Sequence, residues 1–504
     1  MLSVFDQGSP PPCPAPFNMA AHVLRQAGRL ANKTALSILG ETGTEDWSFA
    51  DLESAILGTG TGLLQAGLNP GDIVLMRLGN SVEFPIAYLG AIAVGVIPVP
   101  TSAQLTEPET AQIISDLSPA AVLRDPSIAC APHPKQVELD QLTRMRDLPP
   151  AAFAMGNPNR LAYVVYTSGT SGNPRAVAHA HRAIWARQMM VDGWYGLREN
   201  DRLCHAGAFN WTYTLGTGLM DPWTIGATAL IPHPDTELAN LPALLRRHKA
   251  SIFAAAPGVY RKLLQRPLPD LPDLRHGLCA GEKLSRPLHE HWMQATGTQL
   301  YEAYGMSECS TFVSSNPTHP AQGEALGRPQ PGRRVAILGP DGPVPQGQEG
   351  TIAVHRDDPG LMLTYLNAPG EAEARMQGDW FLTGDQGVMA VDGQITYLGR
   401  NDDMMNAGGY RVSPVEVEAV LSHHPGIAQA GAAAVEVKPD TFVIAAFYTG
   451  PEELDEAALQ AYVSDKLARY KQPRVFVHLP ALPTGGNGKL LRRALPAYFK
   501  ATPE

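Results

Sequence analysis

The clearest chemical pattern in the chain lies between Tyr166 and His181, where the sequence reads YTSGTSGNPRAVAHAH. Small hydroxyl residues and glycines fill positions 167–172, and Arg175 follows them. Glycine lets the backbone curl so that successive N–H groups can bind anionic oxygens, and hydroxyls and a guanidinium add donors. The spacing is neither the Walker pattern nor G-x-G-x-x-G. It predicts a phosphate-binding loop, with a polar hairpin turn as the alternative.

The segments on either side of this loop predict how it is held. LAYVVY before it is an apolar β-type run, and RAVAHAH after it alternates like a strand. Two strands that can pair favour an ordered turn over a flexible linker. His179 and His181 lie on one face of the second strand, and no third ligand lies near them in sequence. We therefore predict no metal site at these histidines.

The rest of the chain predicts an α/β protein with more than one domain, because 504 residues exceed what one core usually organises. Helical patterns over 20–31 and 49–67 alternate with strands, which predicts parallel sheets covered by helices. The alternation resumes from Leu203 to about Tyr304. Gly- and Pro-rich segments at 327–355 then predict a subdomain of β hairpins.

The last hundred or so residues read as a separate α+β unit. Ser413 is a candidate N-cap, Pro414 suits the first helical position, and Glu416 completes a capping box. A strand, a helix and a second strand follow this helix. The predicted domains are therefore 1–401 and 402–504.

Composition narrows the class of protein. A net charge of −10 argues against a nucleic-acid partner. The cysteines lack CxxC spacing, which predicts free thiols rather than a disulfide scaffold or a zinc site. The N-terminus lacks the pattern of a signal peptide, and the apolar run 85–100 is short for a membrane span. We expect a soluble cytoplasmic protein with no membrane span.

Four further motifs follow the loop in order: YEAYGMSE, FLTGDQG, YLGRNDDMMNAGGYRVSPVEVE and PTGGNGKLLRR. Together with the loop they resemble the adenylate-forming superfamily of acyl-CoA synthetases, adenylation domains and firefly-type luciferases. The resemblance runs from about Leu52 to Arg493. It implies that a carboxylate attacks the α-phosphate of ATP to give an acyl-adenylate and pyrophosphate, and that a thiol then attacks the acyl group.

The resemblance implies roles for individual residues in the first step. Lys489 would place its ammonium between the carboxylate and the α-phosphate. At ~4 Å and an effective dielectric of ~20 this contact is worth ~4 kcal/mol, or roughly a thousandfold in rate. Glu308 would hold Mg²⁺, and Ser307 would donate to a phosphate. The implied ATP and AMP set is Thr167, Ser168, Gly169, Thr170, Ser171, Gly172, Arg175, Gly281, Glu282, Lys283, Tyr304, Gly305, Met306, Ser307, Asp385, Arg400, Arg411 and Lys489.

For the second step, the resemblance implies that the C-terminal domain is mobile and rotates about a hinge at Asp402. Glycines on the rotated face would let the pantetheine arm of CoA pass close to the backbone. The implied CoA-binding set is Gly408, Gly409, Tyr410, Arg411, Tyr470, Lys471 and Gln472.

The acid is predicted to be medium-chain or aromatic. LMDPWTIGA and APGVYRKLLQ look most like segments of medium-chain acyl-CoA and benzoate–CoA ligases. Acetate-activating relatives carry a tryptophan where this chain has Gly305, so a glycine should leave room for a longer or aromatic group. Asn210 lacks the charge that would hold an amino-acid amine. The implied acyl pocket is Phe209, Asn210, Trp211, Gly305 and Met306, of which the apolar side chains could equally be ordinary core.

Two departures from the family pattern stand out. Where the loop of relatives reads G-K-P-K-G, residues 172–176 read G-N-P-R-A, which keeps one cation. The segment 432–447 is shorter than usual, at the edge of the small domain that would face CoA. Three alternatives to a CoA ligase remain: an enzyme that loads a carrier protein, a luciferase-type oxygenase, and a non-catalytic nucleotide-binding relative. A homodimer is left open.

Overall fold

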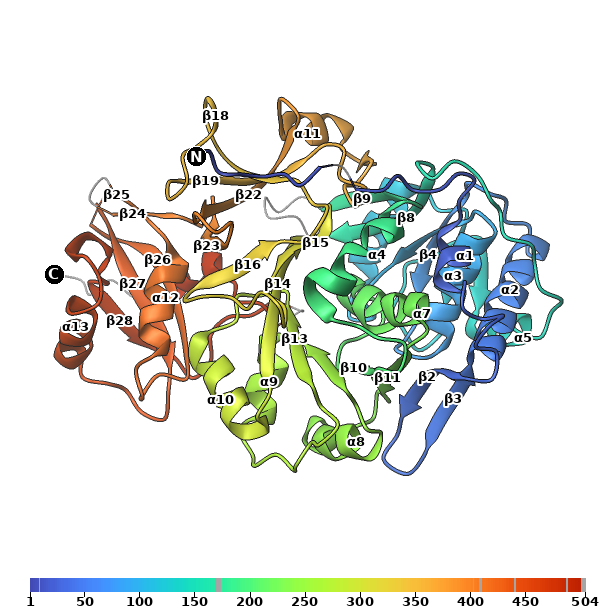
Figure 1. Ribbon diagram of the computed structural model, residues 1–504, viewed down its shortest axis with the longest axis horizontal. Helices are drawn as coiled ribbons and strands as arrows, with labels where there is room; N and C mark the ends of the chain where they lie inside the picture. The colour runs from blue at the N-terminus through green and yellow to red at the C-terminus, as the bar shows by residue number, and fades with distance from the viewer. Residues whose placement is uncertain are drawn as a thin grey trace.

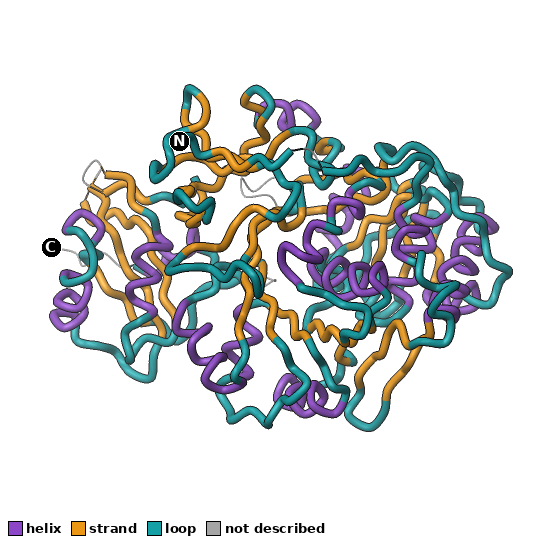
Figure 2. Tube along the Cα trace, in the orientation of Figure 1, coloured by secondary structure: helices purple, strands orange, loops and turns teal. Residues whose placement is uncertain are grey.

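The computed structural model describes residues 1–8, 10–167, 174–401, 403–407, 410–438, 441–485 and 488–499 (Figure 1). The chain forms a large N-terminal part of sheets covered by helices, and a smaller C-terminal part of strands flanked by helices (Figure 2). The predicted α/β class is therefore confirmed, and the mobility of the small part stays a prediction.

A four-stranded parallel sheet occupies the N-terminal end. Its strands, in spatial order, are β5 (Ile97–Pro100), β4 (Ile73–Arg77), β6 (Ala121–Arg124) and β7 (Gln136–Glu138). Its helices are α2 (Phe49–Gln65), α3 (Glu83–Ala93), α4 (Glu107–Leu117) and α5 (Leu139–Met145). The apolar run from Pro85 is a buried helix that leads into β5, as predicted.

A second sheet carries the parallel strands that hold most of the predicted site. In spatial order they are β2 (Thr34–Leu39), β11 (Thr228–Pro232), β10 (Arg202–His205), β12 (Ile252–Ala255), β13 (His276–Ala280) and β14 (Gln299–Met306). β3 (Thr44–Ser48) pairs antiparallel at the edge. The associated helices are α6 (Ala183–Ala186), α7 (Asp221–Ile225), α8 (Leu241–Arg247), α9 (Pro257–Leu263) and α10 (Arg286–Thr296), with π-helical turns at Val191–Tyr195 and Thr214–Met220 and a 3-10 turn at Leu238–Asn240.

The same sheet continues from β14 into antiparallel strands, which confirms the predicted hairpins. These strands are β15 (Ser310–Ser314), β16 (Ala325–Pro329), β17 (Val335–Gly339), β18 (Gly342–Pro343), β19 (Glu349–His355), β21 (Met376–Gln377), β22 (Trp380–Met389) and β23 (Ile395–Arg400). The N-terminal strand β1 (Val4–Phe5) pairs with β17, so the start of the chain lies on this subdomain (Figure 1).

The strands around the predicted phosphate loop pair as expected. β8 (Leu161–Thr167) and β9 (Arg175–Ala180) are antiparallel, with Thr167 opposite Arg175. β20 (Thr364–Tyr365) adds to β9, and the short helix α11 (Pro369–Ala374) follows it. The loop residues 168–173 lie outside the described residues.

The C-terminal part packs two helices on a three-stranded sheet, beside a separate β hairpin. Its elements are β24 (Met405–Ala407), β25 (Tyr410–Val412), α12 (Pro414–Ser422), β26 (Gln429–Lys438), β27 (Thr441–Thr449), α13 (Glu456–Ser464) and β28 (Val475–His478), with 3-10 turns at Arg469–Lys471 and Arg492–Tyr498.

Two local predictions were wrong in part. The helix predicted over 20–31 ends at Val23, and the turns after it still bury Leu24 and Ala27. At α12, Ser413 Oγ accepts from the Glu416 amide at 3.3 Å as predicted. The Glu416 carboxylate, however, accepts from Lys471 Nζ at 2.6 Å. An ion pair within the folded domain outcompetes the local capping bond, because a charged donor binds a carboxylate more strongly than a neutral amide.

The remaining sequence predictions concern membrane spans, disulfides and metal ligands. Within the described ranges, no helix is both long and apolar enough to cross a membrane. All five cysteines are free thiols, as predicted. In the same part of the chain, no cluster of three or more His, Cys, Asp or Glu side chains is arranged to hold a metal.

Candidate active site

The predicted site residues gather where the parallel strands end. Residues 206–211 follow β10, residues 281–284 follow β13, and residues 304–308 lie at the end of β14. Because these strands are neighbours and run in the same direction, their carboxyl ends meet at one edge of the sheet. Ligands of open α/β sheets bind at this edge.

Lys489 reaches this edge from the C-terminal part of the chain. A Cβ placed on Gly281 would lie 3.1 Å from Trp211 Cζ2 and 3.9 Å from Lys489 Cε. Gly281 has a φ of +97°, which an L side chain rarely adopts. Three segments far apart in sequence therefore converge on one glycine, and Lys489 is placed at the predicted nucleotide site.

The charges around Lys489 are only partly solvated. Burial lowers the pKa of Lys489, with Arg400 also lowering it while Glu282 and Asp385 oppose the shift. Burial also raises the pKa of Glu282, although Arg261, Lys489 and Arg492 oppose this. More than a third of the Lys489 residue remains accessible, although its ammonium is partly desolvated. A partly desolvated cation gains more from an incoming anion than a solvated one.

Asp385, Tyr304 and Arg400 form a second group. Tyr304 Oη donates to Asp385 Oδ2 at 2.5 Å, and Arg400 Nε lies 3.7 Å from Asp385 Oδ1. Asp385 and Arg400 are opposite one another on β22 and β23, which explains why two residues from separate motifs meet. The ring of Tyr304 packs on Phe312 and Tyr397, with centroids 5.3 and 5.7 Å away. A buried carboxylate beside a guanidinium is suited to accept hydroxyl hydrogen bonds.

Glu308 lies two residues beyond the end of β14. Tyr365 Oη donates to its Oε1 at 2.6 Å, and Arg375 Nη1 lies 3.2 Å from the same oxygen. Mg²⁺ is commonly held by one or two carboxylates together with phosphate oxygens, so a single carboxylate fits a metal that arrives with a nucleotide. The neighbouring Ser307 accepts a hydrogen bond at its carbonyl from His179 Nε2 at 2.7 Å.

His179 and His181 are buried and hydrogen-bonded within the protein. Burial lowers the pKa of His179 to about 4 and that of His181 to about 3. His181 Nδ1 accepts from the Met19 amide at 3.0 Å. Both histidines are therefore interior residues that form hydrogen bonds within the protein.

Two predicted nucleotide-binding cations have carboxylate partners within the protein. Arg175 Nε donates to Glu371 Oε2 at 2.8 Å. Lys283 Nζ lies 2.9 Å from Glu302 Oε2, and Glu302 is buried. Lys283 therefore anchors the 281–284 segment to β14, whereas the Arg175 pair is half exposed on the Glu371 side.

The acyl-pocket residues divide into core and edge. Phe209 is 1% exposed and packs into the core that α2 and α3 share. Asn210, Trp211 and Met306 are partly exposed. A Cβ on Gly305 would lie 2.0 Å from the Ser310 carbonyl oxygen and 2.5 Å from Thr311 Cα. The glycine is thus required by the close approach of β15, and its effect on pocket size stays a prediction.

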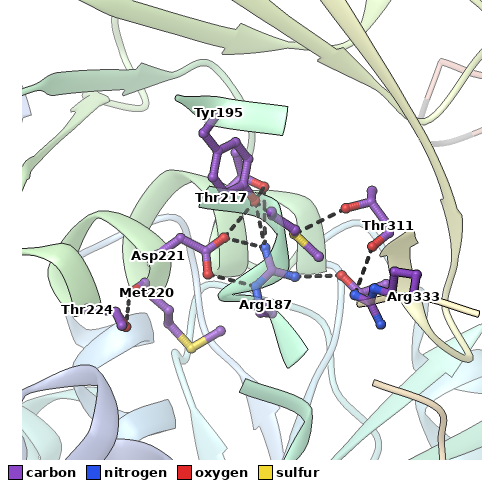
Figure 3. A network of polar contacts seen from close by, with 10 residues as sticks. Arg187, Tyr195, Thr217, Met220, Asp221, Thr224, Thr311 and Arg333 are labelled. Atoms are coloured by element: carbon purple, nitrogen blue, oxygen red, sulfur yellow. Dashed lines mark hydrogen bonds and ion pairs between the residues drawn. The ribbon is translucent and has the colours of Figure 1, made fainter. Parts of the chain in front are cut away.

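The polar network drawn in Figure 3 includes Arg187, which bonds to Ser310, the residue whose carbonyl oxygen limits the space at Gly305. Arg187 donates to both carboxylate oxygens of Asp221, at 2.8 and 2.6 Å, and to Ser310 Oγ at 2.6 Å. Tyr195 Oη donates to Asp221 at 2.7 Å and shares a hydrogen bond with Thr217. Ser310 has a φ of 63°, which is uncommon for a non-glycine residue. The network ties β15 to the π-helical turn that follows Trp211.

Several predicted residues are placed away from the site or are not described. Lys471 pairs with Glu416, Gln472 Nε2 donates to the Leu467 carbonyl at 2.8 Å, and Tyr470 is 40% exposed. Thr167 is the last residue of β8. The predictions that lie outside the described residues are Ser168, Gly169, Thr170, Ser171, Gly172, Asp402, Gly408 and Gly409, together with the side chains of Tyr410 and Arg411.

No sequence pattern singled out Arg375, Tyr365 or the Arg187–Asp221 pair as functional. Arg375 and Glu308 are 67 positions apart, and Arg187 and Asp221 are 34 apart. No local pattern connects residues at such distances. The only sequence signal was a cation within a few residues of a recognised motif, and the chain has many such cations.

Comparison with known proteins agrees with this geometry. A family model described as AMP-binding enzyme matches residues 23–366, and one described as AMP-binding enzyme C-terminal domain matches residues 416–489. The chain is 28% identical to the mitochondrial acyl-coenzyme A synthetase ACSM3 of Rattus norvegicus, over 96% of this chain and 90% of that protein. It is also 28% identical to the benzoate–CoA ligase of Thauera aromatica, over 97% of this chain and 98% of that protein.

A solved structure gives the same result. The anthranilate CoA ligase AuaEII, in complex with anthranoyl-AMP, aligns with a TM-score of 0.87 at 26% identity, over 96% of this chain and 98% of that one. The family model alone spans more than half of the chain. The chain belongs to the AMP-binding enzyme family, and the predicted resemblance is confirmed.

Proposed function

We propose that the protein is an ATP-dependent acid–thiol ligase that activates a medium-chain or aromatic carboxylic acid as acyl-AMP, releases pyrophosphate and transfers the acyl group to CoA. The enzyme class is confirmed, because the relatives and structural neighbours are acyl-CoA synthetases and aromatic acid–CoA ligases. ATP and CoA are the substrates that this class uses. The size and character of the acid are proposals.

One observation supports the adenylation step more than any other. Lys489 comes from the C-terminal end of the chain, yet its Cε lies beside the position of a Gly281 Cβ, near Glu282, Asp385 and Arg400. The first step brings a carboxylate to an anionic phosphate, so a cation between them lowers the barrier. We assign this role to Lys489, and the roles of adenine and ribose contact to residues 281–282, Tyr304, Asp385 and Arg400.

Glu308 is our candidate for the ligand of Mg²⁺, which would arrive with ATP and neutralise part of the phosphate charge. Tyr365 Oη fixes the orientation of this carboxylate. Ser307 and the loop 167–172 complete the proposed phosphate contacts, with Arg175 at the start of β9.

The second step needs a different arrangement of the C-terminal part. With Lys489 at the site, Lys471 and Gln472 are bonded within their own domain. We propose that domain 402–504 rotates relative to 1–401 about Asp402 and brings the 408–411 face to the acyl-adenylate. A cytoplasmic location and a homodimer complete the proposal, and sedimentation of the purified protein tests the dimer.

Carboxylate-dependent exchange of label between pyrophosphate and ATP tests the first step, and CoA consumption tests the second. The panel runs from acetate to octanoate and includes benzoates, with Mg²⁺ present. We expect exchange and CoA consumption with mid-length or aromatic acids and little with acetate. Exchange without CoA consumption would instead favour the carrier-protein alternative. Absence of exchange together with absence of ATP binding would refute the proposed function.

A further inference from the structure

We propose that Arg375 is a further nucleotide-binding residue. Its guanidinium pairs with Glu308 in the absence of nucleotide, and it would bind the β- and γ-phosphate oxygens instead when a metal–nucleotide complex occupies that carboxylate. The inference rests on the proposed function, because it needs a triphosphate beside Glu308. It adds a residue outside the motifs, from the end of α11.

The first observation is the pairing at Glu308. Arg375 Nη1 lies 3.2 Å from Glu308 Oε1, which also accepts from Tyr365 Oη. The Glu308 side chain is 15% exposed and that of Arg375 is 34% exposed. The carboxylate is thus enclosed, while the guanidinium keeps an open side that can receive a further anionic partner.

The second observation is that two aromatic rings lie against the guanidinium. Arg375 Cζ lies 5.7 Å from the ring centroid of Tyr365 and 5.9 Å from that of Phe381. Both distances are within the range of cation–π attraction. A stacked arginine loses little further freedom when it forms new hydrogen bonds, so it is well prepared to change partners.

The third observation connects α11 to the end of the predicted phosphate loop. Asn367 Oδ1 accepts from the Ala176 amide at 3.0 Å, and Asn367 Nδ2 donates to the Pro174 carbonyl at 3.0 Å. Glu371 pairs with Arg175 from the same segment. The segment 365–375 therefore touches both Glu308 and the strand that follows the loop, which brackets the proposed position of the triphosphate.

The charges give the direction of the exchange. A divalent metal on Glu308 would repel a guanidinium bound to the same carboxylate. Phosphate oxygens on that metal offer the guanidinium a new partner, and its planar fork matches their geometry. The same reasoning applies to Arg175, for which the Glu371 carboxylate competes with phosphate.

The test is the binding of nucleotides to Arg375→Gln, measured by calorimetry with Mg²⁺ and without an acid substrate, so that no reaction occurs. We expect the affinity for ATP and for pyrophosphate to fall about tenfold or more, because a charged hydrogen bond is lost. The affinity for AMP should change less than twofold, since AMP lacks the β- and γ-phosphates. The Mg²⁺ concentration that half-saturates ATP binding should fall, because a competing cation is gone.

Three further variants keep the result interpretable. Arg375→Lys should recover part of the ATP affinity, since it restores the charge without the fork. Arg356→Gln removes an exposed arginine paired with Asp379 and should change none of these affinities. Glu371→Gln should strengthen pyrophosphate binding severalfold, by removing the competitor for Arg175, and it does not depend on how Arg375→Gln folds.

The outcomes separate the inference from the proposed function. Equal loss of ATP, pyrophosphate and AMP binding would show a structural role for Arg375 and overturn the inference. Unchanged binding of all three in Arg375→Gln would overturn it as well. If the unaltered protein itself binds neither ATP nor pyrophosphate, the proposed function fails, whatever the variants do.

Discussion

Two regions of the molecule use arginine–carboxylate pairs in opposite ways. In the network drawn in Figure 3, the Arg187 and Asp221 side chains are 11% and 4% exposed, and Tyr195, Thr217 and Ser310 supply further hydrogen bonds. At the candidate active site, the Arg375 side chain is 34% exposed and its contact with Glu308 is longer, at 3.2 Å. In the Arg187–Asp221 pair, protein groups supply the hydrogen-bond partners of both side chains. In the Arg375–Glu308 pair, the guanidinium can still accept a ligand as a partner.

The degree of burial determines what each kind of pair can do. Removing one member of a buried pair leaves an uncompensated charge, so such a pair fixes a geometry and does not exchange partners. A partly exposed pair contributes less than a buried one, so one of its members can exchange its partner for a ligand at a smaller cost. The Arg187–Asp221 pair is tightly packed, since a Cβ on Gly216 would lie 2.2 Å from Arg187 Nη2.

The largest effect on stability is expected from Arg187→Met. It leaves Asp221, which is 4% exposed, without its cation, and should lower the free energy of unfolding by about 3–5 kcal/mol. Chemical denaturation measures the loss. The double variant Arg187→Met/Asp221→Leu should regain most of it. Arg286→Ala, which breaks an exposed i,i+4 pair with Glu290, should change stability by less than about 0.5 kcal/mol. Equal losses in Arg187→Met and Arg286→Ala would refute the comparison.

A comparable effect, on activity, is expected from Lys489→Ala at the candidate active site. Carboxylate-dependent pyrophosphate exchange should fall roughly a thousandfold, because a partly desolvated cation worth ~4 kcal/mol is lost from the reacting anions. Stability should hardly change. Lys466→Ala, at an exposed lysine of the same domain, is the matched control. A decrease in exchange of less than tenfold would contradict the role assigned to Lys489.

The stability of the protein is expected to depend on pH through the buried histidine His205. Burial lowers the pKa of His205, which packs against Tyr213 and beside Gly218, to about 3. The unfolded chain takes up this proton near pH 6.5 and the folded chain does not, so His205 makes stability fall as the pH drops below about 6.5. At pH 5 its share is about 2 kcal/mol.

Unfolding free energies at pH 7 and pH 5 check this expectation. His205→Phe removes the proton uptake while keeping a ring, so the loss between the two pH values should be smaller than in the unaltered protein. Parallel curves for the two proteins would show that His205 is not the group that titrates.

The smallest effect is expected from Lys471→Ala. Its Nζ is paired with Glu416 and its side chain is 24% exposed, so a contact with CoA would replace one ion pair by another. The KM for CoA should rise up to about fivefold, while pyrophosphate exchange stays unchanged. Glu416→Gln should lower the KM for CoA. If both variants alter exchange instead, Lys471 acts in the first step and the assignment to CoA is wrong.

Sequence patterns were sufficient to predict several local elements of the fold. A continuous apolar run predicted β8 and an alternating pattern predicted β9, and their antiparallel pairing is confirmed. The apolar run from Pro85 predicted a buried helix that leads into a strand, as observed. These features follow from neighbouring residues, because the period of the apolar positions and the conformations of Gly and Pro act over a few residues.

Which residues meet in space depends on the tertiary structure. Lys489 and Gly281, Arg375 and Glu308, and Glu416 and Lys471 are brought together by sheet order and domain packing. Gly305 shows the same limit, since its surroundings are the backbone of β15 rather than open space. An ion pair depends on distance through space, and a sequence pattern encodes distance only along the chain. The motifs therefore predicted the candidate site residues, and the fold determined which side chains they contact.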